Sequence, residues 1–230
     1  MNGVDLMKKI LVVLTNTVKY GEKNAATGLW LGEATEFVAE VQKQGFEVDY
    51  VSPQGGFVPL DPRSMKSIDD ESFAVYEQRQ FQEKALAHSL KPSEVTPADY
   101  CGIYYTGGHG VMWDFPNNPE LEKISLQIYE NNGYVMSVCH GIAGLLFMKN
   151  KDGEYFVKDK KITGFTTTEE HLSGKSSVVP FYNEKVAEEH GAQFVKARVF
   201  KSFAVQDGRI ITGQNPFSAK AVAEKFLENI

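Results

Sequence analysis

The chain has 230 residues, and its 24 Lys and Arg against 30 Asp and Glu give a formal net charge of −6 at pH 7. Because binding to a phosphate backbone requires clustered basic residues, this composition argues against a nucleic-acid partner. No apolar run approaches the ~20 residues that a bilayer span requires, so no membrane association is expected. The two cysteines, Cys101 and Cys139, are expected to remain free thiols, as is usual for a cytoplasmic chain that is not exported.

Short apolar runs alternate with helical patterns along most of the chain. Five runs have the length and composition of buried strands: residues 10–14, 46–51, 101–105, 134–138 and 209–212. Four intervening or following segments have helical periodicity: residues 33–44, 118–131, 141–148 and 216–227. This alternation predicts an α/β fold with a mostly parallel sheet and helices on both faces.

Residues 61–97 interrupt the alternation. The segment is polar, contains three prolines, and has a charged helical pattern from Asp69 to Leu90. We interpret it as an insertion over the sheet edge or the active site, within a single domain of residues 1–230.

Candidate chemistry is expected where the strands end, because parallel α/β sheets bind ligands beyond the carboxyl ends of their strands. Cys139 stands where the strand at 134–138 runs directly into a helical pattern. Such a junction forces a tight turn that exposes a nucleophile, and Ser137 and Gly141 are the small residues that it requires on either side. The helix N-terminus is expected to favour the thiolate and to stabilise an oxyanion. The alternative is that Cys139 is a small buried hydrophobic residue, which is the interpretation favoured for Cys101 in mid-strand.

A metal or cofactor is not expected from the sequence. The five histidines are scattered along the chain, without the clustered spacing of a zinc site: His88, His109, His140, His171 and His190. Phosphate-loop and dinucleotide glycine patterns are absent as well. We therefore predict an enzyme that works without metal or cofactor.

Three segments together resemble the DJ-1/PfpI superfamily: the Val138–Gly141 motif VCHG, the Gly107–Gly110 loop GGHG, and Glu33 at a helix start. The closer similarity is to its Hsp31-like branch, and it extends over nearly the whole chain, including residues 45–52 and 212–216. The resemblance implies a flavodoxin-like three-layer sandwich and a homodimer. It also implies a glutathione-independent, glyoxalase III-type hydro-lyase that converts methylglyoxal, a small reactive aldehyde, to lactate.

The resemblance also implies roles for matching residues. Cys139 would attack the aldehyde to form a thiohemiacetal, with His140 as its proton-accepting neighbour and Glu33 as a buried carboxyl that moves protons. The acid of the triad follows residues 162–166 by a few positions, where spacing favours Glu170 and leaves Glu169 as the alternative.

Four further positions match the substrate-binding and oxyanion region of the family. Gly107, Gly108 and Gly141 would let backbone N–H groups approach the substrate, and His109 would flank the pocket as a binding or structural residue. Without the resemblance, Glu33 would be interpreted as a glutamate that favours a helix dipole, and the later glutamates as solvated surface residues.

Other functions stay open on the sequence. A stress chaperone would act through exposed apolar surface without needing Cys139. A deglycase or a small-substrate cysteine peptidase or amidase would use the same Cys–His pair, and a redox sensor would oxidise the thiol. Replacing Cys139 by serine separates the enzymes from the chaperone, and substrate size separates the glyoxalase from the peptidase.

Overall fold

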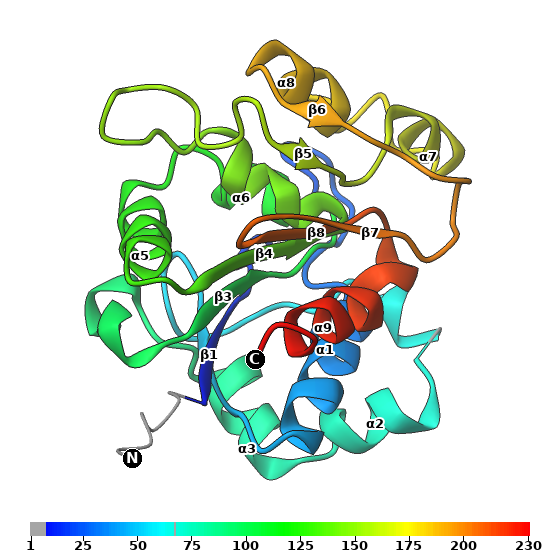
Figure 1. The fold of residues 1–230 in the computed structure, drawn as a ribbon. Coiled ribbons are helices and arrows are strands. Elements are labelled where there is room, and N and C mark those ends of the chain that lie inside the picture. Colours follow the sequence, from blue (N-terminus) through cyan, green and yellow to red (C-terminus); the bar gives the residue numbers. More distant parts are fainter. Residues whose placement is uncertain (1–7, 67) are drawn as a thin grey trace, which may run out of the picture.

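The computed structural model describes residues 8–66 and 68–230, and a six-stranded sheet lies at its centre (Figure 1). The strand order across the sheet is β2-β1-β3-β4-β8-β7. The strands in chain order are β1 (Lys9–Val13), β2 (Glu47–Val51), β3 (Gly102–Tyr105), β4 (Tyr134–Val138), β7 (Ala204–Asp207) and β8 (Ile210–Gly213). All neighbours pair in parallel except β7, which runs antiparallel to β8 at the edge. The predicted mostly parallel α/β sheet is confirmed.

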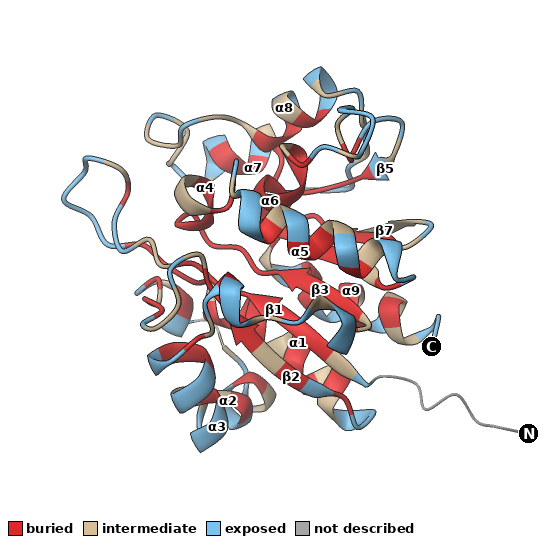
Figure 2. Cartoon of the chain, turned by 90° about the vertical axis from the view of Figure 1, so that its left-hand side faces the viewer, coloured by how far each residue is buried: buried red, intermediate tan, exposed pale blue. Residues whose placement is uncertain are grey.

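Helices cover both faces of this sheet, and β1 illustrates why. Alternate side chains of a strand point to opposite faces. Ile10 and Val12 enter a buried cluster with Phe37, whereas Leu11 and Val13 enter a second cluster on the other face. The first cluster is covered by α1 (Leu31–Lys43) and α9 (Ala219–Leu227), and the second by α4 (Val111–Asp114), α5 (Pro119–Glu130) and α6 (Ala143–Leu146). Figure 2 shows the buried residues concentrated in the strands and on the inner faces of the helices.

Residues 61–97 lie along the β2 edge and against α1, and they do not form the single helix expected from Asp69 to Leu90. The segment contains α2 (Asp70–Tyr76), α3 (Arg79–Phe81) and a π-helical stretch at Gln82–Ala87. Gln78 is extended, with a ψ of 125°, and this breaks the helix between α2 and α3. Leu90 then forms a parallel bridge with Val51, which covers the edge of the sheet.

The region between residues 149 and 203 contains elements that the sequence did not predict. They are β5 (Lys161–Ile162), α7 (Thr167–Leu172), α8 (Asn183–Glu189) and β6 (Gln193–Phe194), which lie together above the sheet in Figure 1. β5 and β6 form a small parallel pair of their own. The N–H of Phe165 donates to the Cys139 carbonyl at 3.1 Å, so this region reaches the end of β4.

Across residues 8–66 and 68–230, every helix is too short or too polar to pass through a bilayer.

Candidate active site

Cys139 occupies a strained backbone position directly after β4. Its φ is 56°, in the left-handed region that non-glycine residues rarely adopt. The predicted helix at 141–148 is shorter than expected, because Cys139–Ile142 form a 3₁₀ turn and α6 spans only Ala143–Leu146. This turn packs directly on β3, since a Cβ at Gly141 would lie 2.4 Å from the Tyr105 carbonyl oxygen. The geometry agrees with a nucleophile elbow.

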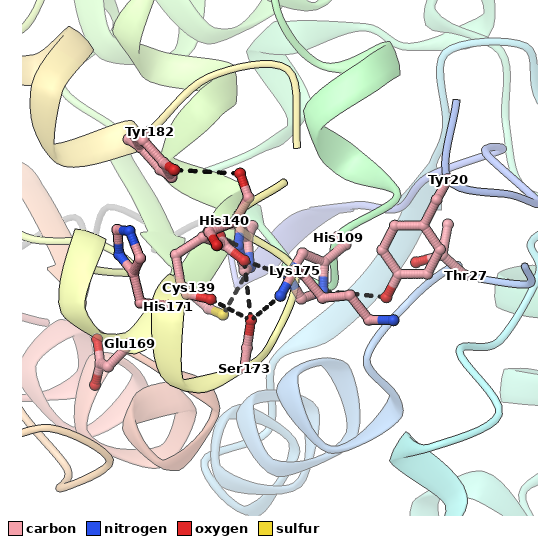
Figure 3. A network of polar contacts seen from close by, with 12 residues as sticks. Tyr20, Thr27, His109, Cys139, His140, Glu169, His171, Ser173, Lys175 and Tyr182 are labelled. Carbon is pink, nitrogen blue, oxygen red and sulfur yellow. Dashed lines mark hydrogen bonds and ion pairs between the residues drawn. The ribbon is translucent and has the colours of Figure 1, made fainter. Parts of the chain in front are cut away.

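His140 connects the thiol to a carboxylate (Figure 3). Its Nδ1 lies 3.3 Å from the Cys139 Sγ, and its Nε2 lies 2.6 Å from the Oε2 of Glu170. Although burial of Glu170 opposes ionisation, its contacts with His140 and His109 hold the carboxyl pKa well below the usual range. The side chains are therefore arranged as a Cys–His–Glu triad.

Of the two glutamates that the sequence left as alternatives, Glu169 does not contact His140. It caps α7, where the Thr166 N–H donates to its Oε2 at 3.1 Å. Its Oε1 accepts hydrogen bonds from Gln214, Asn215 and the Phe200 N–H. Glu169 thus fastens α7 to the end of the sheet, and the next residue of the helix is turned toward His140.

Glu33 is a fully buried carboxyl on the first turn of α1. The helix start is held by the Trp30 N–H, which donates to the Gly107 carbonyl, and by the Tyr104 hydroxyl, which donates to the Glu33 carbonyl. Among the described residues, neither side-chain oxygen of Glu33 has a partner in good hydrogen-bond geometry. Burial raises the carboxyl pKa well above its usual value, and the Cys139 thiol and the Gly107 N–H offset part of this rise.

The thiol itself is more basic than the sequence suggested. Burial raises the pKa of Cys139 well above its usual value, and the neighbouring Glu33 carboxyl raises it further, while the His140 N–H offsets only part of this. The expected thiolate-favouring effect of the helix N-terminus is present in the His140 N–H, but burial outweighs it in the resting site. The physical reason is that a four-residue 3₁₀ turn has a small dipole, whereas a thiol with 2% exposure loses nearly all its hydration. Ionisation of this thiol needs a base in contact with it.

His109 lies on the other side of the same carboxylate. Its Nε2 is 2.9 Å from the Oε1 of Glu170, and its ring centroid is 4.2 Å from that of His140. Burial, followed by the proximity of His140, lowers the pKa of His109 to about 4, so its ring is neutral near pH 7. The five histidines are scattered along the sequence, but the fold brings two of them, His109 and His140, to one glutamate.

These three residues also form the one group in the described part of the chain that could offer three ligand atoms to a metal ion. Ligand atoms of His109, His140 and Glu170 lie within 4.8 Å of one another. Both Nε2 atoms, however, are hydrogen-bonded to the Glu170 oxygens. We therefore interpret the group as an acid–base network and assign no metal to it.

A cavity of about 370 Å³ opens beside the thiol. Its polar lining includes Cys139, His140 and Glu33, and its aromatic lining comprises Trp30, Phe165, Phe200 and Phe217. Of the predicted substrate-binding residues, Gly108 and His109 line the cavity. Gly107 and Gly141 lie behind it, at positions where a Cβ would collide with Glu33 and with β3, respectively.

Several lining residues were missed by the sequence analysis. Arg63 enters from the segment at 61–97, and Ser173 and Phe200 enter from the region that contains α7. The Ser173 hydroxyl donates to the Oε1 of Glu170 at 3.0 Å. No motif marks these positions, because they come from loops whose path is set by tertiary contacts.

Because His109 is buried in its neutral form, we expect the stability of the fold to decrease at acidic pH. Its pKa is about 4 in the folded chain against 6.5 for a free histidine, so between these values the unfolded chain binds more protons. We expect this residue to reduce the free energy of unfolding by about 3 kcal/mol as the pH falls from 6.5 to 4. Denaturant unfolding across this range measures the effect. His109→Gln should show a shallower pH dependence, and identical slopes for both proteins would contradict it.

The fold and site together define a class, an α/β sandwich with a cysteine at a strand–turn junction backed by histidine and glutamate. The family model described as "DJ-1/PfpI family" matches residues 25–229, and the chain belongs to this family. The resemblance inferred from the sequence is thereby confirmed.

Individual relatives align over nearly their full length. The glutathione-independent glyoxalase HSP31 of Saccharomyces cerevisiae is 35% identical, with 96% of this chain and 97% of the relative covered. Glyoxalase 3 of Candida albicans is also 35% identical, with 96% and 98% covered.

Solved structures are also similar to this chain over nearly its full length. The crystal structure of glyoxalase III from Candida albicans has a TM-score of 0.88 at 32% identity, covering 96% of this chain and 97% of its own. The Rapid Encystment Protein of 24 kDa from Francisella tularensis has a TM-score of 0.92 at 35% identity, with 96% and 98% covered.

Proposed function

We propose that this protein is a glutathione-independent glyoxalase of the glyoxalase III type, which converts methylglyoxal and water to lactate. The observation that carries the proposal is the pairing of a His140-linked thiol with the unpartnered, buried carboxyl of Glu33 at one small cavity. The activities named for the relatives from Saccharomyces cerevisiae and Candida albicans support the same reaction class.

In the first step, the Cys139 sulfur attacks the aldehyde carbon and a C–S bond forms. The thiol proton passes to His140 Nδ1, which lies 3.3 Å from the sulfur, and Glu170 stabilises the resulting imidazolium. The aldehyde oxygen takes this proton back from the imidazolium and becomes the hydroxyl of a thiohemiacetal. This coupling of attack to proton transfer suits a thiol whose pKa is raised by burial.

In the second step, a proton moves from the former aldehyde carbon to the neighbouring carbon through an enediol. A carboxyl with a raised pKa is matched to this transfer, because a base poised near the working pH is the most effective. Burial raises the pKa of the Glu33 carboxyl, which makes its ionised form a stronger base, and Glu33 lines the cavity beside the thiol. The product of the step is a thioester of lactate on Cys139, with no external oxidant or reductant consumed.

In the third step, water attacks the thioester carbonyl, the C–S bond breaks, and lactate leaves while the thiol is restored. The developing oxyanion would be stabilised by N–H groups of Gly108, Cys139 and His140. Gly108 suits this role because its φ of +100° and the Gly28 carbonyl oxygen, which would lie 2.3 Å from a Cβ, exclude a side chain there. No metal, cofactor or glutathione takes part in this scheme.

The test is methylglyoxal consumption and lactate release by the purified protein, without glutathione and with a chelator present. We expect stoichiometric lactate under these conditions. A folded protein that consumes no methylglyoxal would overturn the proposal. The homodimer, the cytoplasmic location and the single-domain organisation with an insertion at 61–97 remain predictions.

A further inference from the structure

A line of polar contacts extends from Arg63 to the thiol of Cys139, beyond the triad itself. Figure 3 shows Tyr20, His109, His140 and Cys139 along this line. One end is the Arg63 guanidinium, which is held by the fully buried Asp61 through Nε at 2.9 Å and Nη2 at 2.7 Å. The line passes through side chains from five separate parts of the chain: Arg63, Tyr20, His109, Glu170, His140 and Cys139. The proposed mechanism uses only the last three of them.

The chemistry of the arginine sets the direction of the first hydrogen bonds. A guanidinium has donors and no acceptor. Arg63 Nη2 lies 3.3 Å from the Nδ1 of His109 and also donates to the Tyr20 hydroxyl, which itself lies 3.3 Å from the same Nδ1. If this nitrogen carried a proton, two donors would face each other in a buried site. The single ring proton of neutral His109 therefore belongs on Nε2.

The position of the His109 proton then determines the donors and acceptors at the Glu170 carboxylate. The Nε2–H of His109 donates to the Oε1 of Glu170 at 2.9 Å, and the Ser173 hydroxyl donates to the same oxygen at 3.0 Å. The contacts with both histidines hold the Glu170 pKa low and keep the carboxylate ionised. Its Oε2 therefore accepts from the Nε2–H of His140 at 2.6 Å. The Nδ1 of His140 is left unprotonated, facing the thiol of Cys139.

We infer that Arg63 and His109 are positioning residues that fix the tautomer of His140, so that its Nδ1 remains a base toward the thiol. His109 lines the cavity, yet both of its ring nitrogens are engaged by protein groups, so it acts through Glu170 and not on the substrate. The role of this tautomer in turnover rests on the proposed glyoxalase function, whereas the tautomer itself follows from the hydrogen bonds.

Two substitutions of His109 separate positioning from other roles. In His109→Gln, the side-chain amide can donate to Glu170 and accept from Arg63, so the hydrogen-bond direction is preserved. In His109→Leu, a side chain of comparable bulk removes both contacts. We expect kcat for methylglyoxal to stay within about threefold for the glutamine variant and to fall about 10–100-fold for the leucine variant, with KM little changed.

A second measurement does not depend on the glyoxalase reaction. The rate at which iodoacetamide alkylates Cys139 reports proton removal by His140, and it should follow the same order of wild type, glutamine and leucine variants. If the alkylation order holds while methylglyoxal is not consumed, the proposed function fails and the positioning inference stands. If kcat and the alkylation rate fell equally in both variants, the imidazole of His109 itself would be required. If the leucine variant kept wild-type values, His109 would only fill space. Each of these results overturns the inference.

The tautomer can also be measured without any substitution, which keeps the inference testable if His109→Leu does not fold. Nitrogen-15 NMR of the wild-type protein should show neutral His140 and His109 each protonated at Nε2. A proton found on Nδ1 of either ring in the resting protein would overturn the inference.

Discussion

Replacing Cys139 by serine should reduce methylglyoxal turnover at least about a thousandfold, since the reaction begins with attack by the sulfur. A hydroxyl is a far weaker nucleophile than a thiol at neutral pH, and His140 cannot compensate for that difference. The substitution is nearly isosteric, so the elbow with its φ of 56° should persist and the thermal midpoint should change little. Lactate release measured together with thermal unfolding distinguishes loss of the nucleophile from loss of the fold.

Cys101 provides the matched control for this experiment. It is the other free cysteine, half-buried directly before β3, and its thiol donates to the Lys9 carbonyl at 3.3 Å. Cys101→Ser should retain wild-type turnover. If Cys139→Ser retained it as well, the thiol would not be the nucleophile. A stress chaperone acting through apolar surface would then gain weight over every cysteine-dependent enzyme.

The parts of the fold that sequence reasoning predicted are those set by local pattern. The strand at 134–138 was predicted to the residue, because a strand buried along most of its length is a largely apolar run, bounded here by Gly133 and by the turn at Cys139. The edge strand β7 and the short pair β5 and β6 were missed. Their half-buried residues carry no clear periodicity, and their pairing depends on the sheet that is already formed.

The site was predictable where a motif marks it and not where distant segments meet. Cys139 and His140 stand in one motif, so their contact followed from the chain itself. The choice between Glu169 and Glu170 needed the orientation of α7, which is set by hydrogen bonds to residues more than 30 positions away. The raised thiol pKa was not predictable either, because burial of Cys139 depends on the packing of the whole cavity.

Glu33→Gln should preserve the first chemical step and block the second. Attack by Cys139 requires only His140 as base, whereas the carbon-to-carbon proton transfer requires a carboxyl that can release and accept a proton. We expect kcat to fall about 10²–10⁴-fold, the range for loss of a general acid–base group. The thiohemiacetal on Cys139 should then accumulate, visible by mass spectrometry of intact protein as the addition of one methylglyoxal.

The same variant has an expected signature in stability, because Glu33 has a raised pKa in the folded protein. Above pH 4.5 the unfolded chain ionises this carboxyl while the folded chain keeps it protonated, so its burial costs progressively more stability as the pH rises toward the folded-state pKa. Glu33→Gln cannot ionise, so its unfolding free energy should decline less over that range than that of the wild type.

Glu36 allows the role of Glu33 to be separated from a general effect of charge. It lies one turn further along α1 and lines the same cavity, and burial with the nearby Asp69 raises its pKa to about 7. Glu36→Gln should change kcat less than about tenfold, because Glu33 and not Glu36 is the carboxyl that interacts with the Cys139 thiol. Equal losses in the two variants, with no thiohemiacetal accumulating in Glu33→Gln, would mean that acidity of the cavity as a whole drives the proton transfer. Glu33 would then lose its assigned part in the mechanism.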